Sequence, residues 1–300
     1  MGGLIKFTLA ATLLASFSAC SDDSVPVIPE PEVEAVGTPT YDADLEPSAA
    51  VLALVPQSAT TLTVTDYEQV RLQMGLQSLT TADPKKERKA FWVRAEAERP
   101  LLSTGMLRES EPRLEKRYGL SQLDVDWEAH FFDAQGEAGY VLVFREGTKM
   151  AAVEKAVDDG VGPLAGATVD RAARMVSSGT IDDGDASWAA DQESVSLVGL
   201  PANSTYLARG CVEAPVNGPL EALDEYSVQF EGTLVTARLG SDRLDLFTRM
   251  RAAFEAPEFA ASFGGGVADP LTGRIGYVMN DPAAAADLAL DGELPFAACA

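Results

Sequence analysis

The stretch LDVDWEAHF at residues 123–131 is followed, after a short connection, by GYVLVF at residues 139–144. In the first stretch apolar and polar side chains alternate, which is the period of a half-buried β-strand. The second stretch is a continuous apolar run, which is typical of a buried strand. Only a few residues, including Ala-Gln-Gly at 134–136, separate the two runs. Together they predict an antiparallel β-hairpin.

Four segments share a local plan in which a β-rich run gives way to a helical pattern. Each segment changes from period 2 to a period near 3.6. The four units are residues 61–76, 139–160, 233–254 and 273–292.

Capping residues predict where the helices of these units begin. Thr65 opens a capping box in the first unit. Asp281 followed by Pro282 is typical of a helix N-terminus in the fourth unit. In the third unit, Ser241 or Asp242 is the expected cap.

The arrangement of hairpins and helices predicts the fold class. Residues 225–232, EYSVQFEG, form a second hairpin arm ahead of the third unit, so a hairpin precedes a helix in both parts of the chain. Antiparallel strands with helices packed on one face make an α+β fold. The pattern suggests two related halves, residues 49–165 and 190–300, joined by the Gly-, Ser- and Asp-rich segment 177–194.

The amino terminus has the composition of an export signal. Residues 1–20, MGGLIKFTLAATLLASFSAC, contain Lys6, an uncharged run from Phe7 to Ala19, and then Cys20. A basic start, an apolar run and small residues before a cleavage point form a secretory signal. The run is too short for a spanning helix, which needs about 20 apolar residues.

The small residues before Cys20 resemble the lipobox of bacterial lipoproteins. This resemblance implies that residues 1–19 are a removed signal peptide and that the thiol of Cys20 carries a diacylglycerol, with the new amino terminus acylated. An ordinary secretory signal cut near Ala19 is the alternative. Residues 20–48 are rich in Pro and acidic residues and contain no Lys or Arg. Such a composition predicts a disordered tether for the globular region 49–300.

Composition narrows the classes of function. The chain has 300 residues and a formal net charge of −23. Removing the signal leaves enough chain for one large domain or two small ones. A strongly acidic surface disfavours nucleic acid and anionic lipid, so no nucleic-acid partner is expected. The seven lysines against sixteen arginines indicate a GC-rich genome.

The cysteines predict a disulfide. If Cys20 is lipidated, Cys211 and Cys299 remain as a pair in an oxidising compartment. Each lies beside an expected strand, so we predict that they are bonded to each other. Two buried free thiols are the alternative.

The polar face of the strand at 123–131 is a candidate metal site. Alternation places Asp124, Asp126, Glu128 and His130 on one face, and carboxylates and imidazole are ligands for divalent ions. Same-face neighbours lie about 6–7 Å apart along a strand, so one ion could bridge two of them. The alternative is a half-buried strand with a solvated polar face.

The motifs of common enzyme classes are absent from the sequence. It contains no G-x-S-x-G elbow, Walker loop, HExxH or GxGxxG, and His130 is the sole histidine. We therefore expect no catalytic activity and no cofactor. Residues 263–270, FGGGVADP, are expected to form a flexible loop. The rival hypothesis is a metal-dependent enzyme or metal binder centred on residues 124–130.

One basic region stands out in this acidic chain. Residues 84–99, PKKERKAFWVRAEAER, form an expected helix ended by Pro100. Its cations and the aromatic Phe91 and Trp92 could contact anionic lipid or a wall polymer. The alternative is a solvated face with the aromatic rings in the core. The cations at its start are Lys85, Lys86, Arg88 and Lys89.

Five further stretches between residues 50 and 300 are ATTLTVTDYEQVR, RKAFW, DVDWEAHF, VGPLAGA and YLARGC. They resemble stretches of actinobacterial cell-surface lipoproteins of unknown function. The resemblance implies a lipid-anchored protein at the extracytoplasmic face of the cell membrane and brings no catalytic residue. We expect a non-catalytic binding or envelope-accessory domain, whose partner is another envelope protein or a wall component.

Overall fold

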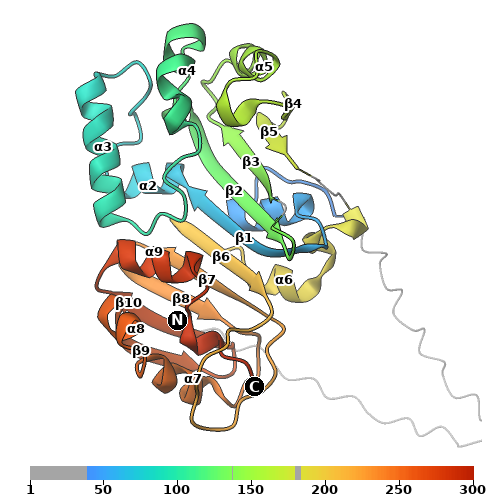
Figure 1. Cartoon of the computed structure of the whole chain (residues 1–300), viewed down its shortest axis with the longest axis vertical. Coiled ribbons are helices and arrows are strands. Elements are labelled where there is room, and N and C mark those ends of the chain that lie inside the picture. Colours follow the sequence, from blue (N-terminus) through green and yellow to red (C-terminus); the bar gives the residue numbers. More distant parts are fainter. Residues whose placement is uncertain (1–38, 137, 180–183) are drawn as a thin grey trace, which may run out of the picture. The chain divides into compact units, whose positions relative to one another are not determined.

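The computed structural model describes residues 39–136, 138–179 and 184–300, which form an α+β fold (Figure 1). All strands belong to one antiparallel sheet of ten strands, in the order β4-β5-β3-β2-β1-β6-β7-β8-β10-β9. The α+β prediction is confirmed. The strands are β1 (Ala59–Asp66), β2 (Val125–Asp133), β3 (Ala138–Phe144), β4 (Thr168–Asp170), β5 (Met175–Ser178), β6 (Ser204–Arg209), β7 (Glu225–Glu231), β8 (Leu234–Arg238), β9 (Phe263–Asp269) and β10 (Arg274–Met279).

The longer helices lie on one face of the sheet, here called the helix face (Figure 1). Short 3-10 helices η1 (Val51–Leu54) and η6 (Trp188–Ala190) pack on the opposite face, and η3 (Gln122–Asp124) precedes β2. The α-helices are α1 (Pro47–Ala50), α2 (Tyr67–Gln73), α3 (Lys85–Glu98), α4 (Glu111–Tyr118), α5 (Met150–Asp158), α6 (Gln192–Ser196), α7 (Leu246–Ala253), α8 (Pro257–Ser262) and α9 (Pro282–Leu290).

The two five-stranded halves of the sheet share one strand order. From each edge inward the order is β4-β5-β3-β2-β1 and β9-β10-β8-β7-β6, and β1 pairs with β6 where the halves meet. The first half includes β5 and therefore extends to Ser178, beyond the expected boundary at residue 165. The expected linker 177–194 is also partly packed, because Trp188 is fully buried.

All four predicted strand-to-helix units are present. They are β1 with α2, β3 with α5, β8 with α7, and β10 with α9. Asp281 caps α9 as predicted, accepting hydrogen bonds from the N–H groups of Ala283 and Ala284 at 3.1 Å. The predicted hairpin of β2 and β3 is present as well.

Two predicted caps are wrong. Asp66, not Thr65, caps α2 by accepting from the N–H of Gln69, because β1 continues through Asp66. Helix α7 begins after Asp245 rather than after residue 241 or 242. The backbone of Asp242 is left-handed and its N–H bonds to the carbonyl of Leu271, so the loop crosses to the β9–β10 turn before the helix starts.

The folded body begins earlier than residue 49. The run Val51–Val55 is buried against the opposite face, and Tyr41 packs against the same core. Residues 39–48 therefore belong to the body, and the expected tether shortens to residues 20–38, which lie outside the described part of the chain.

Residues 263–269 form edge strand β9, so the flexible loop expected there is wrong. The glycines serve packing rather than flexibility: a Cβ on Gly266 would lie 2.9 Å from the side chain of Met250 on α7. Gly265 has a φ of +56°, which glycine adopts at little cost, and forms an irregularity in the pairing with β10.

Two separate apolar cores lie on the helix face, one in each half. Cross-strand partners share a face, and one row across the sheet runs Leu142, Glu128, Thr65, Ser204 and Phe230. Its ends belong to the two cores and its middle is polar. This polar seam separates the cores where the halves join. The loop 101–107 crosses it, with Leu101 and Leu107 in the first core and Leu102 in the second.

The carboxyl terminus is held by the predicted disulfide. Cys211 and Cys299 are bonded, with Cα atoms 5.0 Å apart. The N–H of Cys299 donates to the carbonyl of Val212 at 2.9 Å, and the N–H of Val212 donates to the carbonyl of Ala297 at 2.8 Å. The disulfide prediction is confirmed.

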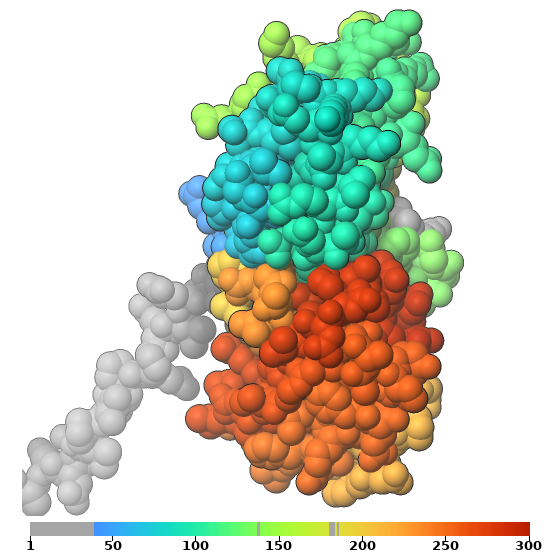
Figure 2. Space-filling view, turned by 90° about the vertical axis from the view of Figure 1, so that its left-hand side faces the viewer, coloured from blue at the N-terminus to red at the C-terminus, as the bar shows by residue number. Residues whose placement is uncertain are grey.

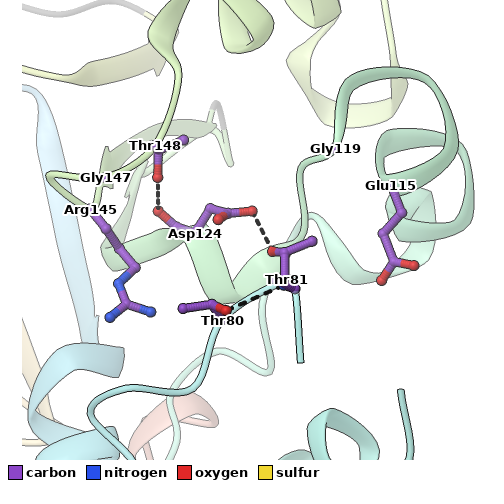
Figure 3. Close-up of a pocket in the computed structure, with 9 residues that line it drawn as sticks. Thr80, Thr81, Glu115, Gly119, Asp124, Arg145, Gly147 and Thr148 are labelled. Carbon is purple, nitrogen blue, oxygen red and sulfur yellow. Dashed lines mark hydrogen bonds between the residues drawn. The ribbon is translucent and has the colours of Figure 1, made fainter. Parts of the chain in front are cut away.

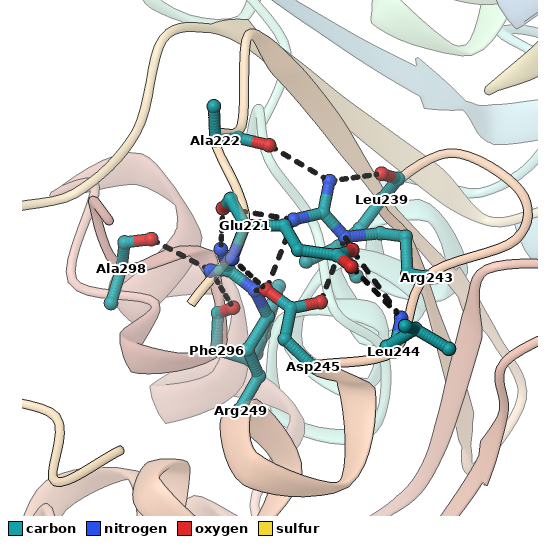
Figure 4. Close-up of polar contacts among 9 residues, drawn as sticks. All are labelled: Glu221, Ala222, Leu239, Arg243, Leu244, Asp245, Arg249, Phe296 and Ala298. Atoms are coloured by element: carbon teal, nitrogen blue, oxygen red, sulfur yellow. Dashed lines mark hydrogen bonds and ion pairs between the residues drawn. The ribbon is translucent and has the colours of Figure 1, made fainter. Parts of the chain in front are cut away.

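A buried arginine supports the same terminus (Figure 4). Arg249 is fully buried and donates to the carbonyls of Phe296 at 3.1 Å and Ala298 at 2.6 Å. Its Nε donates to Asp245 at 2.6 Å, and Arg243 donates to both oxygens of the same carboxylate at 3.0 Å. Burial opposes ionisation of Asp245, but these donors outweigh it and lower the pKa to about 2. Asp245 is therefore ionised and binds both arginines.

We expect the combined change Cys211→Ser and Cys299→Ser to lower the free energy of unfolding by about 4–5 kcal/mol, because the disulfide closes a loop with a sequence separation of 88. For a body of this size the melting temperature should fall by about 10 °C. Thermal unfolding followed by circular dichroism measures it, with reduced wild-type protein as the matched control. A loss below about 1 kcal/mol would show that the Arg249 contacts hold the terminus unaided.

Candidate functional site

Of the four residues of the predicted metal site, the structure brings only Glu128 and His130 into contact. Asp124 lies in η3 before the strand, where its carboxylate accepts from the N–H of Ser121 and the hydroxyl of Thr81, both at 2.7 Å. Asp126 pairs with Arg71 at 2.6 Å. The expectation that all four alternate along one strand is therefore wrong, because β2 begins at Val125.

Glu128 is fully buried in the polar seam. It accepts from the amide of Gln122 at 2.9 Å, from the N–H of Met106 at 3.3 Å and from the hydroxyl of Ser103. The Nε2 of His130 lies 3.3 Å from the same carboxylate. Burial opposes ionisation, but these contacts outweigh it and lower the pKa of Glu128. The solvated polar face expected for this strand is thus wrong at Glu128, which holds the loop 101–107 on the sheet.

Ser103, His130 and Glu128 include the residue types of a hydrolytic triad but not its order of contacts. The Ser103 hydroxyl donates to Glu128, whereas in a triad it donates to the imidazole. Among residues 39–136, 138–179 and 184–300, no three His, Cys, Asp or Glu side chains are placed to hold a metal ion.

A threonine-rich pocket of about 630 Å³ lies between α4, η3 and the loop after β3 (Figure 3). Its polar groups largely bind one another: Thr81 donates to the carboxylate of Asp124, and Thr148 donates to the carbonyl of the same residue at 3.3 Å. Arg145 donates to the carbonyls of Leu79 at 2.6 Å and Gln77 at 2.9 Å. Few of these groups remain to bind a ligand.

A second pocket, of about 780 Å³, is strongly acidic and is here called the acidic pocket. Its walls come from the segment 41–47, the end of β1 with the start of α2, the facing ends of β2 and β3, and the loop 172–174. Six carboxylates line it: Asp44, Glu46, Asp66, Glu68, Asp126 and Glu146.

The negative charge of the acidic pocket is poorly compensated. Among the described residues Arg174 is the single basic residue that lines it, and its guanidinium donates to the carbonyls of Phe144 at 3.1 Å and Thr148 at 2.8 Å. Asp126 has ion pairs with Arg71 and Arg145. The other five carboxylates form no ion pair within the part of the chain that the structure describes.

The pKa values of three carboxyl groups in the acidic pocket are raised. Burial of Asp66, reinforced by the charges of Glu68 and Glu46, raises its pKa from 3.8 to about 7. Burial also raises the pKa of Glu46, and that of Asp126 despite the arginines beside it. A cation bound in the pocket would relieve this cost, because it favours the ionised carboxylates.

Apolar groups form the rest of the acidic pocket. Trp127 and Phe144 are buried in its wall, and Tyr41 is half-buried. Leu45 and Leu72 are half exposed at the same place. Aromatic and aliphatic surface beside carboxylates suits a ligand with both a cationic group and an apolar part.

The remaining predicted features have mixed outcomes. Cys20 lies outside the described residues, so its lipidation stays a prediction. Phe91 and Trp92 are buried in the first core, which confirms the alternative of core aromatic residues. Over the described residues, no helix has both the length and the apolar character needed to cross a bilayer.

The comparisons with known proteins add no relative. The chain matches no protein family model, no curated protein and no solved structure. The resemblance to actinobacterial lipoproteins therefore stays a prediction.

We expect Asp66→Asn to stabilise the fold above neutral pH. Asparagine keeps the capping oxygen of α2 and removes the charge. Because the folded pKa of about 7 exceeds 3.8 in the unfolded chain, ionised Asp66 destabilises the fold fully above about pH 7 and not below about pH 4.

The gain should be about 4 kcal/mol at about pH 8, the free energy that corresponds to a pKa of about 7 against 3.8, and should vanish towards about pH 4. Thermal unfolding at a series of pH values measures it, with the exposed Glu231→Gln as control. An equal gain at every pH would contradict the stated charge effect.

Proposed function

We propose that the protein is a lipid-anchored, extracytoplasmic binding protein that takes a cationic ligand in the acidic pocket. The observation that carries the binding part is the pocket of about 780 Å³ whose six carboxylates face a single, already occupied arginine. Strongly perturbed carboxyl pKa values in a cleft are typical of functional sites. We propose a binding role rather than catalysis, because the pocket holds no nucleophile paired with a base.

Three features support an extracytoplasmic location. The signal-like residues 1–19 end at Cys20 in a pattern that resembles a lipobox. The disulfide between Cys211 and Cys299 suits an oxidising compartment, because cytosolic thiols are kept reduced. The resemblance to actinobacterial surface lipoproteins supports the same location, the extracytoplasmic face of the cell membrane.

The ligand class follows from the pocket walls. Carboxylates attract ammonium or guanidinium groups, and the half-exposed Leu45 and Leu72 add apolar contact. Basic side chains of another envelope protein have this combination. The acidic pocket is favoured over the metal-dependent alternative at residues 124–130, because Asp124 lies outside the strand and Asp126 is paired with Arg71.

We expect Cys20→Ser to move the protein from the membrane fraction to the soluble fraction, because the serine hydroxyl cannot replace the thiol that accepts the lipid. Fractionation of the native host with a high-salt wash, which removes charge-held proteins, measures it. The control variant, Cys211→Ser with Cys299→Ser, should stay with the membrane. Retention of Cys20→Ser after the wash would contradict the anchor.

We expect Glu68→Gln with Glu146→Gln to weaken binding of a trilysine peptide about fivefold to tenfold, because two pocket carboxylates are neutralised. Isothermal titration calorimetry measures the affinity. The matched control, Glu231→Gln with Asp287→Asn, changes the net charge equally at exposed sites in the second half. Equal weakening by both variants would mean that the peptide senses only overall charge.

A further inference from the structure

Charge is distributed unevenly over the folded body. Residues 84–118 contain ten basic and six acidic side chains, whereas residues 190–300 contain six basic and sixteen acidic side chains and no lysine. All six lysines of the described residues lie between Lys85 and Lys155. The net charge of −23 therefore does not describe every face of the molecule.

The positive charge is concentrated where α3 and α4 meet. The ion pair between Arg88 and Glu115 joins the first turns of α3 to α4. Around it are five exposed cations with no ion-pair partner among residues 39–136, 138–179 and 184–300, here called the basic surface. They are Lys85, Lys86, Lys89, Arg113 and Lys116.

The basic surface belongs to one side of the first half. Figure 2 shows α3 and α4, in teal and green, forming the upper part of one face above the orange and red second half. Helix α3 contacts α9, and towards its carboxyl-terminal end Glu96 and Glu98 are neutralised by ion pairs with Arg108 and Arg94. The positive charge without ion-pair partners thus lies at the start of α3 and on α4, whereas the second half carries the excess of acidic side chains.

The aromatic residues of α3 take no part in this surface. Phe91 and Trp92 are buried against Tyr67 and the rest of the first core. A partner of the basic surface would therefore meet charged side chains without aromatic groups to insert. This favours attraction to a charged surface over insertion into an apolar one.

We propose that the basic surface rests on the anionic headgroups of the membrane that carries the lipid anchor. This rests on the proposed function, because the anchor keeps phospholipid phosphates within reach at high effective concentration. The charge asymmetry of the folded body then selects which of its faces meets the membrane. Anionic headgroups attract the start of α3 and α4 and repel the acidic second half.

The net negative charge does not prevent this contact. At about 0.1 M salt, electrostatic attraction and repulsion fall off over about 10 Å. The five exposed cations of α3 and α4 act within that distance when this face meets the bilayer, and they outnumber Glu87 and Glu111 in the first turns of the same helices. The acidic groups of the second half lie on other elements. Each lysine near an anionic membrane strengthens binding about fivefold.

The test uses the mature chain, residues 20–300, with Cys20→Ser, so that no lipid contributes. Co-sedimentation with vesicles of pure phosphatidylcholine is compared with vesicles containing one third phosphatidylglycerol. We expect binding only to the second kind, lost in high salt. Lys85→Glu with Lys89→Glu should reduce it more than tenfold. Arg251→Glu with Arg274→Glu is the matched control, since it reverses two exposed cations in the second half, and should leave it unchanged within twofold.

Three outcomes would overturn the proposal. They are no preference for anionic vesicles, an equal loss of vesicle binding in both variants, or binding of the protein to soluble polyphosphate without any binding to vesicles. None of them bears on the lipid anchor, because the protein in this assay carries no lipid. Conversely, fractionation of cells that express Cys20→Ser tests the anchor alone, because the high-salt wash removes proteins that are held to the membrane by charge. The two proposals can therefore fail separately.

Discussion

The antiparallel pairing of β1 with β6 is the constraint on which the rest of the structure depends. It joins two five-stranded halves into one sheet, and its two faces are filled differently. On the opposite face Leu62 and Leu207 are paired within a continuous apolar core. On the helix face Thr65 and Ser204 are paired within the polar seam. The halves are thus held together by one face, while the other keeps their cores apart.

The polar seam explains why Glu128 can be buried. A carboxylate without partners in an apolar core would be strongly destabilising, but the loop 101–107 crosses the seam and supplies donors to it. In the acidic pocket, by contrast, most carboxylates lack partners within the described residues that would compensate their charge. Asp66 and its neighbours remain largely without cationic partners, so the fold carries an electrostatic cost there that a ligand can remove. Glu128 thus stabilises the architecture, whereas the carboxylates of the acidic pocket are available for binding.

Local periodicity predicted much of the fold and little of the site. The β2–β3 hairpin, the four strand-to-helix units and the Asp281 cap all depend on neighbouring residues, and each was predicted correctly. Burial of Glu128 and inclusion of Tyr41 in the body depend on segments distant in the chain, so periodicity could not reveal them. The acidic pocket draws on four such segments, and of its six carboxylates only Asp126 had been singled out. Strand β9 was missed because a run of glycines is typical of a loop, and the packing of α7 against these glycines cannot be seen in the sequence.

The distribution of lysines has a practical consequence for work at surfaces. Amine-reactive reagents can modify side chains of the folded body only between Lys85 and Lys155, in the first half. Covalent coupling through lysines would therefore immobilise every molecule by that half, with the second half and its pinned carboxyl terminus directed to solution. A chain with evenly spread lysines would attach in many orientations. Here uneven composition alone makes the immobilised layer directional.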